Sequence, residues 1–236
     1  CMAVSGRCSL SLATGGRSAS RGACLQPCRR SYRIVDDARG VELAVDEGRV
    51  LSPADLKTVD VMDRMVASGA TIFKIEGRAR SPEYVATAVA CYKEALESVL
   101  AGDFEALGRD RWDARLAGVF NRGFWHGWYL GERTLRRVEG PGSQATVKKV
   151  YAGKCVNYFA RAGAAQFALQ GAGVAEGDRL LATGPTTGAW EWTAPAMRDA
   201  VTQEPMKSAP KGASVTMACR RRLRAGDALY KLVAVR

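Results

Sequence analysis

The chain has 236 residues, of which 47% are hydrophobic and 25% are charged. These fractions are ordinary for a globular protein and argue against a disordered or fibrous chain. No apolar run approaches the roughly 18–20 residues that a membrane span needs, and we recognise no secretory signal. Seven cysteines, an odd number, rule out complete internal disulfide pairing and favour reduced thiols in the cytoplasm.

Residue 1 is a cysteine that already belongs to a motif, so we expect a fragment that lacks its N-terminal part. Charge is spread unevenly along the chain. Residues 1–140 carry a net charge of +3, whereas residues 141–236 carry 14 Lys and Arg against 6 Asp and Glu, a net charge of +8. The change coincides with a Gly/Pro turn cluster at residues 139–143. We therefore predict two domains, at 1–140 and 141–236.

The first domain is predicted to alternate helices and strands, as α/β proteins do. Ser52 and Pro53 have the chemistry of a helix start, and hydrophobic residues then recur at helical spacing until Gly69. Residues 71–76 are rich in the residue types that favour β-structure, which predicts a strand. A second helix is predicted to begin at residues 81–82 and to end before residue 102.

The second domain contains short strand-like runs separated by Gly-rich turns, which predicts a small antiparallel β-barrel. Gly-Asp turns at residues 177–178 and 226–227 precede two of the runs and suggest an internal repeat. The predicted strands are residues 145–151, 166–169, 179–183, 189–193, 214–218 and 228–235.

Four of the seven cysteines crowd the start of the chain with the spacing C-x6-C-x15-C-x3-C: Cys1, Cys8, Cys24 and Cys28. Four thiolates can hold a [4Fe–4S] cluster or a structural zinc ion. Only the last two have the close spacing that structural zinc favours. The spacing alone leaves three interpretations open: an iron–sulfur cluster, a zinc site, and thiols without a metal.

Three blocks of sequence resemble the collagenase-like peptidase family, peptidase family U32. The first is the cysteine block at residues 1–8 and 21–30. The second is a Lys-Ile-Glu-Gly-Arg segment within residues 73–85, and the third is a Phe-Asn-Arg-Gly-Phe block at residues 120–124, followed by 127–130. The blocks occur in the order that the family has, and the resemblance spans nearly the whole chain.

This resemblance implies an α/β fold, namely the C-terminal part of a TIM-barrel-like domain followed by a small antiparallel β-barrel. It also implies chemistry, because some members resemble oxygen-independent hydroxylases of tRNA wobble uridine, a ribosomal RNA cytidine or a ubiquinone precursor. The RNA-modifying branches use prephenate as the hydroxyl source. By position, the ligands of the family's [4Fe–4S] cluster would be Cys1, Cys8, Cys24 and Cys28.

In such a barrel, the alternation of the strand at residues 71–76 would turn Lys74 and Glu76 inward near its carboxyl end, where barrels place their chemistry. Arg78 and Arg80 follow in the loop, and arginine binds carboxylates such as those of prephenate through paired hydrogen bonds. We predict Lys74, Glu76 and Arg78 as catalytic residues and Arg80 as a substrate-binding residue. The alternative is a structural ion pair between Glu76 and Arg78.

The basic second domain predicts contact with nucleic acid. Its densest patches are residues 148–149 and the run Arg220, Arg221 and Arg222 with Arg224. We predict that Arg220, Arg221 and Arg222 bind an RNA substrate. The alternative is a solvated basic face without a partner.

A peptidase needs an activated nucleophile or a metal-bound water. The chain has one histidine, His126, and no H-E-x-x-H helix, which argues against a zinc peptidase. We expect His126 to pack rather than to act as a base. Together with the resemblance, which implies the reaction, its RNA substrate and prephenate, this leads us to predict a cytoplasmic iron–sulfur hydroxylase without a membrane partner, which converts tRNA wobble uridine to 5-hydroxyuridine with prephenate. The alternatives are a ribosomal RNA hydroxylase, a U32-type peptidase, and a non-catalytic RNA-binding module with a structural zinc ion.

Overall fold

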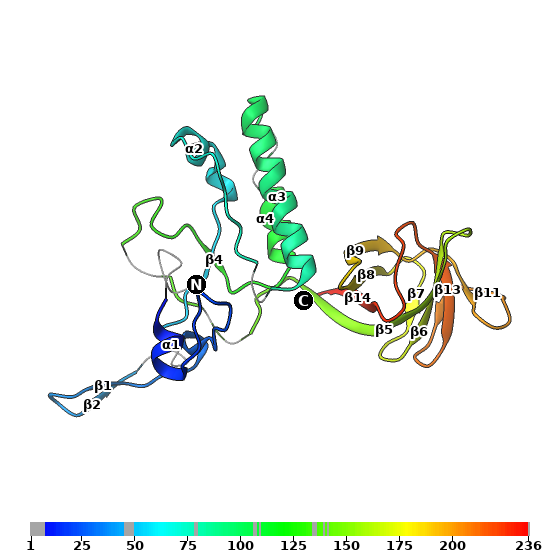
Figure 1. Cartoon of the computed structure of the whole chain (residues 1–236), viewed down its shortest axis with the longest axis horizontal. Helices are drawn as coiled ribbons and strands as arrows, with labels where there is room; N and C mark the ends of the chain where they lie inside the picture. Colours follow the sequence, from blue (N-terminus) through cyan, green and yellow to red (C-terminus); the bar gives the residue numbers. More distant parts are fainter. Residues whose placement is uncertain are drawn as a thin grey trace. The chain divides into compact units, whose positions relative to one another are not determined.

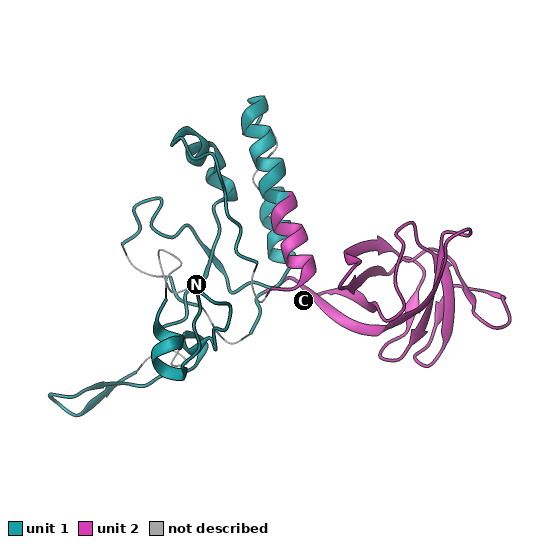
Figure 2. Cartoon of the chain, in the orientation of Figure 1, with its two compact units in different colours: residues 1–78, 91–144 teal, residues 79–90, 145–236 magenta. Residues whose placement is uncertain are grey.

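The computed structural model describes residues 8–44, 50–77, 80–105, 108, 110–133, 136–138, 140 and 142–235. The chain divides into two compact units (Figure 2). The first unit contains Cys1–Arg78 and Cys91–Gln144, and the second contains Ala79–Ala90 and Ala145–Arg236. No helix among the described residues is long and apolar enough to cross a lipid bilayer.

The first unit has short regular elements joined by long irregular segments (Figure 1). Strands β1 and β2 form an antiparallel hairpin, whereas β3 and β4 pair in parallel across the intervening helices. The helix α3 begins in the second unit and ends in the first. The elements are α1 (Leu10–Gly15), η1 (Pro27–Arg29), β1 (Ile34–Asp36), β2 (Val41–Leu43), β3 (Asp55–Leu56), η3 (Val59–Val61), α2 (Met62–Ala67), α3 (Pro82–Ala101), α4 (Asp110–Gly118) and β4 (Phe124–Trp125).

The helix predicted from Ser52 is wrong in its first half. Pro53 forms an isolated antiparallel bridge with Arg137, and Asp55 then enters β3. The Asp55 carboxylate accepts a hydrogen bond from the Arg122 backbone N–H at 3.1 Å, so it does not cap a helix. Regular α-helix starts only at α2, which ends two residues before Gly69, as predicted. Tertiary contacts with distant segments therefore override the local helix-start signal.

The predicted strand at residues 71–76 is also wrong, because the described residues 71–77 form no regular element. A strand needs a hydrogen-bonding partner, and no strand in the described part of the chain pairs with this run. The next prediction is confirmed, since α3 covers Pro82–Ala101 and Gly102 follows it with φ of +79°.

The second unit contains an eight-stranded antiparallel sheet in the order β11-β10-β13-β6-β5-β14-β8-β9, so the chain is mixed α/β with one large sheet. A further antiparallel pair joins β7 to β12. The bounds are β5 (Val147–Phe159), β6 (Ala164–Leu169), β7 (Val174–Ala175), β8 (Arg179–Gly184), β9 (Gly188–Thr193), β10 (Met197–Asp199), β11 (Pro205–Met206), β12 (Ser208–Ala209), β13 (Ser214–Ala218) and β14 (Ala228–Ala234).

All six strands predicted for this unit are present, and the short strands β7, β10, β11 and β12 were missed. Strand β5 continues to Phe159 past an irregularity in its pairing between Cys155 and Asn157, where the local pattern ceases to look like a strand. The sheet order ends at β11 and β9, which are not paired with each other in the described residues, so closure into a barrel stays a prediction.

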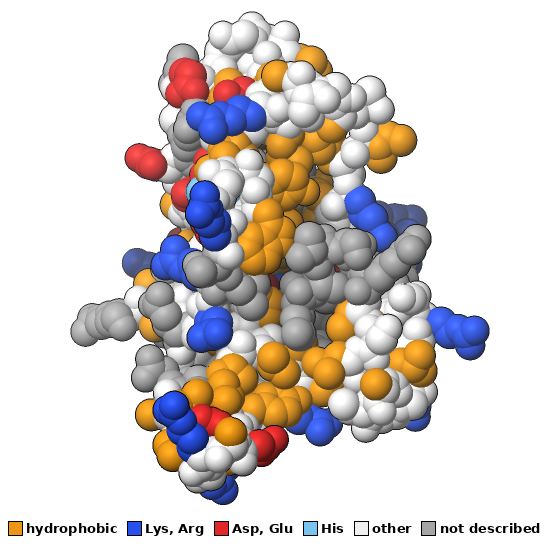
Figure 3. Space-filling view, turned by 90° about the vertical axis from the view of Figure 1, so that its left-hand side faces the viewer, with side chains coloured by type: hydrophobic (Ala, Val, Ile, Leu, Met, Phe, Trp, Pro, Cys, Tyr) orange, Lys and Arg blue, Asp and Glu red, His pale blue; other side chains and the backbone are white. Residues whose placement is uncertain are grey.

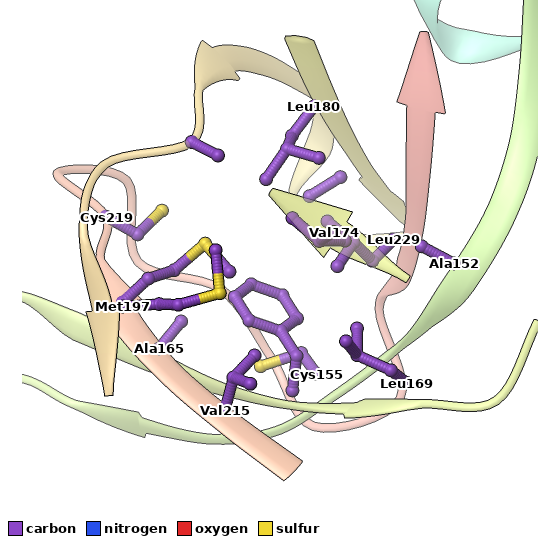
Figure 4. Packing of buried hydrophobic residues seen from close by; sticks show 14 of the residues in the cluster. Ala152, Cys155, Ala165, Leu169, Val174, Leu180, Met197, Val215, Cys219 and Leu229 are labelled. Atoms are coloured by element: carbon purple, nitrogen blue, oxygen red, sulfur yellow. The ribbon is translucent and has the colours of Figure 1, made fainter. Parts of the chain in front are cut away.

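The sheet covers one hydrophobic core, which is drawn in Figure 4. Alternate side chains of β6 and β13 point into it, as the period of two in a strand requires. Phe167, Leu180, Val215 and Leu229 have no exposed surface. Cys155 and Cys219 are buried in the same core, where they pack as small apolar residues.

The first Gly-Asp turn is closed by a specific set of hydrogen bonds. Asp178 donates its N–H to the Ala175 carbonyl at 3.1 Å, and its carboxylate accepts the Ala175 N–H at 2.7 Å. Gly177 donates to the Ala194 carbonyl, and the Ala194 N–H donates back to the Asp178 carbonyl.

The second Gly-Asp turn repeats the same four bonds. Asp227 donates to the Arg224 carbonyl at 3.0 Å and accepts the Arg224 N–H at 2.8 Å. Gly226 donates to the Cys155 carbonyl, and the Cys155 N–H donates to the Asp227 carbonyl. The two copies are therefore equivalent turns, which confirms a local internal repeat.

Candidate functional site

The cysteine block forms one corner of the first unit. Cys8 lies just before α1, Cys24 lies in the following loop, and Cys28 lies in η1. Burial raises the pKa of Cys28, Arg29 opposes this rise, and the nearby charges of Cys24 and Cys8 add to it. The three described thiols therefore lie near enough to interact electrostatically.

Close packing and one arginine hold this corner in place. A Cβ atom at Gly15 would lie 2.5 Å from Leu25 Cδ1, so the end of α1 packs closely against the Leu25 side chain in the Cys24–Cys28 loop. Arg29 Nη1 donates to Ser52 Oγ at 2.8 Å and to the Pro53 carbonyl at 2.7 Å. We call residues 8–29 the cysteine corner. These two hydrogen bonds connect it to the segment that precedes β3.

The predicted metal site is only partly visible, because Cys1 lies outside the described residues. Thiolates are the donors that an iron–sulfur cluster requires, so the donor type fits. Within the described part of the chain, however, no group of three or more His, Cys, Asp or Glu side chains could hold a metal ion. The three described thiols are neighbours that do not converge, and the cluster stays a prediction.

The predicted catalytic residues of the 71–80 segment remain untested. Lys74 and Glu76 are exposed on an irregular segment, so the strand alternation that was to turn them inward is missing. Arg78 lies outside the described residues. The Arg80 guanidinium lies 4.6 Å from the centroid of the Tyr84 ring, a cation–π contact at the start of α3.

A charged cluster that the sequence analysis missed lies at the carboxyl ends of β3 and β4. Lys57 directly follows β3, and His126 directly follows β4. Lys57 Nζ lies 2.7 Å from both carboxylate oxygens of Asp113 and 3.7 Å from Asp60 Oδ1. His126 Nε2 lies 2.7 Å from Asp60 Oδ2. We call Lys57, Asp60, Asp113 and His126 the β3–β4 cluster.

Three members of the β3–β4 cluster are partly or largely shielded from solvent, whereas the Asp113 side chain is 43% exposed. The Lys57 side chain is 10% exposed, and Asp60 and His126 are half-buried. Burial raises the pKa of Asp60, but the hydrogen bond with His126 and the charge of Lys57 outweigh it, so the pKa lies below its usual range. Asp60 is therefore a carboxylate at neutral pH. Parallel α/β folds place functional groups at this end of their strands.

Sequence reasoning missed this cluster because its members were assigned to other structures. Lys57 and Asp60 were placed in a helix, and His126 was expected to pack without a partner. The useful signal was the position of His126 directly after the apolar pair Phe124–Trp125, which becomes β4.

The predicted RNA-binding residues lie on a loop of the second unit. Arg220, Arg221, Arg222 and Arg224 are all exposed, and none is paired with a carboxylate of the described residues. Lys149 differs, because it forms an ion pair with Glu83 and lies over the Tyr230 ring at 5.1 Å.

Hydrogen bonds join the arginine loop to the end of β5. The Cys219 N–H donates to the Gly163 carbonyl at 2.8 Å, and residues 226 and 227 exchange backbone bonds with Cys155. Exposed Lys154, Phe159 and Arg161 therefore lie on segments that adjoin the loop. We call residues 154–163 and 219–227 the basic surface.

The basic surface carries six cationic side chains and a single acidic one, Asp227. That carboxylate is buried, where it accepts hydrogen bonds from Thr187 Oγ1 at 2.5 Å and from the Arg224 N–H. The exposed charge of these two segments is therefore entirely positive.

Known proteins resemble this chain over nearly its whole length or over about half of it. A protein named collagenase from Porphyromonas gingivalis is 43% identical over 231 residues, which cover 98% of this chain and 55% of that protein. The tRNA hydroxylation protein P1 of Bacillus subtilis is 36% identical over 52% of this chain and 30% of its own length. The 23S rRNA 5-hydroxycytidine C2501 synthase of Escherichia coli is 37% identical over 42% of this chain and 15% of its own length.

The chain spans about half the length of the collagenase-named relative, and less of the two RNA-modifying relatives. Residues 1–139, more than half of the chain, match the family model described as Peptidase family U32. This range includes the cysteine corner and the β3–β4 cluster. The chain therefore belongs to peptidase family U32.

Proposed function

We propose that this chain is part of an RNA hydroxylase. The observation that carries the proposal is the basic surface, where Lys154, Arg161 and the exposed arginines of residues 220–224 are gathered without an exposed carboxylate. Such a surface suits the phosphates of RNA, and the exposed Phe159 can stack on an unpaired base. A peptidase has no comparable need for a uniformly cationic surface.

The reaction that we propose is hydroxylation of tRNA wobble uridine to 5-hydroxyuridine, with prephenate as the hydroxyl donor. Relatives named for tRNA hydroxylation and for synthesis of a ribosomal 5-hydroxycytidine support hydroxylation of a pyrimidine. Ribosomal RNA is the alternative substrate. The described cysteines are free thiols, which fits the cytoplasmic location that we propose.

We propose that Cys1, Cys8, Cys24 and Cys28 hold a [4Fe–4S] cluster. The proximity of the three described thiols supports this, and holding a cluster requires them to move closer together. When bound, the cluster supplies redox chemistry to the site. Gln26 donates its N–H to Cys24 Sγ at 3.3 Å, and Arg29 places positive charge beside Cys28, which opposes the rise that burial causes in the pKa of that thiol.

We also propose that residues 1–140 are the C-terminal part of a TIM-barrel-like domain. The parallel pairing of β3 with β4 across α2, α3 and α4 supports this, since barrels are built from such crossovers. Lys74, Glu76 and Arg78 remain proposed catalytic residues, and Arg80 a proposed contact with substrate.

The test combines two measurements on the full-length protein. Nucleoside mass spectrometry of tRNA and ribosomal RNA from a deletion strain should show loss of 5-hydroxyuridine or 5-hydroxycytidine, restored by the wild-type gene. Reversing the charge of Arg220, Arg221 and Arg222 to Glu should weaken RNA binding and reduce the slope of log affinity against log salt by about 2. Substitution of Arg198, Lys207 and Lys211 by Glu is a control with the same charge change. Unchanged modification of all RNA would refute the function.

A second candidate function is peptide hydrolysis. It is favoured by the hydrogen-bonded Asp60–His126 pair, since a histidine held by a carboxylate can activate water or a nucleophile, and by the relative named collagenase. Release of peptides from gelatin by the metal-loaded, full-length protein, lost in His126→Gln, would favour this candidate.

A further inference from the structure

The β3–β4 cluster has no part in the RNA contacts or the metal site proposed above, although it has the features of an acid–base centre. We propose that His126, oriented by Asp60, accepts the ring proton that the pyrimidine loses when its carbon is hydroxylated. This inference rests on the proposed function and deepens it. His126 would be a catalytic residue, and Asp60 and Lys57 would be positioning residues.

The geometry assigns a role to each nitrogen of the ring. Asp60 is ionised at neutral pH, so its oxygen can only accept, and the His126 Nε2–H must donate to it at 2.7 Å. In the neutral ring, Nδ1 then carries the lone pair. Its neighbouring carboxylate oxygen, Glu132 Oε1, lies 3.9 Å away, too far for a hydrogen bond. Nδ1 is therefore available to a substrate, and the side chain is 26% exposed.

Lys57 is poorly suited to be the base. Both oxygens of Asp113 lie 2.7 Å from its Nζ, and Asp60 Oδ1 lies 3.7 Å away, so the amine is already directed to two carboxylates rather than to a substrate. Its charge instead keeps Asp60 ionised. On α3, the Tyr92 hydroxyl accepts the Thr58 N–H at 2.8 Å, and burial raises the pKa of Tyr92, so this group is neutral.

The charged groups facing His126 thus come from each neighbouring segment. Asp60 and Lys57 follow β3, Asp113 lies on α4, and Glu132 follows β4. Two of these, Asp60 and Glu132, are carboxylates within 4 Å of the ring nitrogens. They stabilise the imidazolium that forms when Nδ1 takes up a proton, which is the charge change required of a base.

The proton step is balanced as follows. The pyrimidine C–H bond breaks, its electron pair stays with the ring, and a new N–H bond forms at Nδ1. The ring carbon uses this electron pair to form a bond to the hydroxyl oxygen of the donor, prephenate in our proposal, whose own C–O bond breaks and leaves its electron pair on the donor carbon. His126 then gives its proton to the reduced donor, so the ring returns to its neutral state.

The test compares variants of the full-length, metal-loaded protein on tRNA. His126→Gln places an amide N–H within reach of Asp60 but provides no base, so it separates a structural role from proton transfer. We expect the hydroxylation rate to fall about a hundredfold or more, with RNA affinity within twofold of wild type. Tyr129→Phe, an exposed change three residues further along, is the control and should retain the wild-type rate.

The pH profile provides an independent readout. Activity requires neutral His126, so the rate falls at acid pH. Asp60→Asn removes a negative charge that favours the imidazolium, so the acidic limb of the rate profile should move about one pH unit lower. We expect the maximal hydroxylation rate of Asp60→Asn to be about tenfold below that of wild type. This variant keeps the inference testable if His126→Gln does not fold.

The outcomes separate the two proposals. If wild type hydroxylates RNA but His126→Gln retains more than a third of the rate, the inference is wrong and the proposed function stands. The inference is also wrong if the acidic limb of the rate profile lies at the same pH in Asp60→Asn as in wild type. If wild type modifies no RNA, both proposals fail. A hundredfold loss in His126→Gln, together with the shifted limb, supports both.

Discussion

The two units of this chain are stabilised in different ways. The second unit buries a continuous hydrophobic core beneath a large sheet, and its hydrogen bonds follow regular ladders. The first unit has only short pairs of strands, and its distant segments are joined largely by polar side chains such as Arg29, Lys57 and Glu94. On the face shown in Figure 3, hydrophobic side chains lie uncovered among Lys and Arg.

One group of exposed apolar side chains in the first unit lies around the cysteine corner and the β1–β2 hairpin. Val35, Val41 and Leu43 of the hairpin are each about half exposed, as are Leu12 and Leu25 near the cysteines. The second unit is therefore stabilised mainly by one continuous apolar core, whereas the first combines separate buried apolar residues, such as Met62 and Trp112, with ion pairs and hydrogen bonds around its candidate site. Four predictions test this difference.

The largest effect is expected from the core of the second unit. Phe167→Ala should lower the free energy of unfolding by about 3–5 kcal/mol, because it removes a fully buried ring and leaves a cavity. Phe159→Ala, which removes the same side chain from a partly exposed site, should cost about 1 kcal/mol or less. Chemical denaturation combined with hydrogen exchange measures both changes and assigns them to a unit. Equal losses would contradict the packing of this core.

The next effect concerns the two equivalent Gly-Asp turns. Asp227→Ala should cost about 3 kcal/mol, since it leaves Thr187 Oγ1 and the buried end of the turn without their acceptor. Asp178→Ala should cost about 1–2 kcal/mol, because Asp178 is more exposed and its partner Lys231 can reach water. The same denaturation experiment compares them. A larger loss in Asp178→Ala would reverse the predicted order.

A smaller effect is expected in the first unit. Lys57→Met should cost about 2 kcal/mol, because Asp60 and Asp113 lose the cation that they share. Lys93→Met is the matched control, since its ion pair with Glu97 is exposed, and it should change stability by less than about 0.5 kcal/mol. Differential scanning calorimetry can measure the shift. If the two variants have the same melting temperature, the β3–β4 cluster does not stabilise the unit.

The smallest effect is a pH dependence at Glu94, which joins α3 to Arg111 and Arg115 of α4. The hydrogen bond from Arg115 lowers the pKa of Glu94 to about 2, from an ordinary value of 4.5. A carboxylate with a lowered pKa stabilises the fold above its ordinary pKa, and this contribution is lost as the pH falls towards 2. The stability difference between wild type and Glu94→Gln should be under about 1 kcal/mol at pH 6 and should vanish near pH 2. A melting series across this range would show it, and a constant difference would contradict the assignment.

Local sequence pattern predicted much of the second unit and the long helix of the first. Strand β13 was placed at its observed bounds, and α3 within a residue at its start, because alternation and helical periodicity act over a few neighbouring residues. The two Gly-Asp turns were recognised as a pair for the same reason. The failures at residues 52–56 and 71–76 share a cause, since a strand exists only where a distant segment pairs with it.

The sequence by itself determined the cysteine block, the family, the basic charge of the C-terminal part and most of its strands. These are properties of residues that are close together along the chain. The tertiary structure alone decided that Lys57 meets Asp113, 56 residues away, and that His126 meets Asp60, 66 residues away. A periodic pattern reflects neighbours within a few residues, so it cannot predict contacts between residues that are so far apart in the sequence. The candidate acid–base centre exists only because β3 and β4 lie side by side.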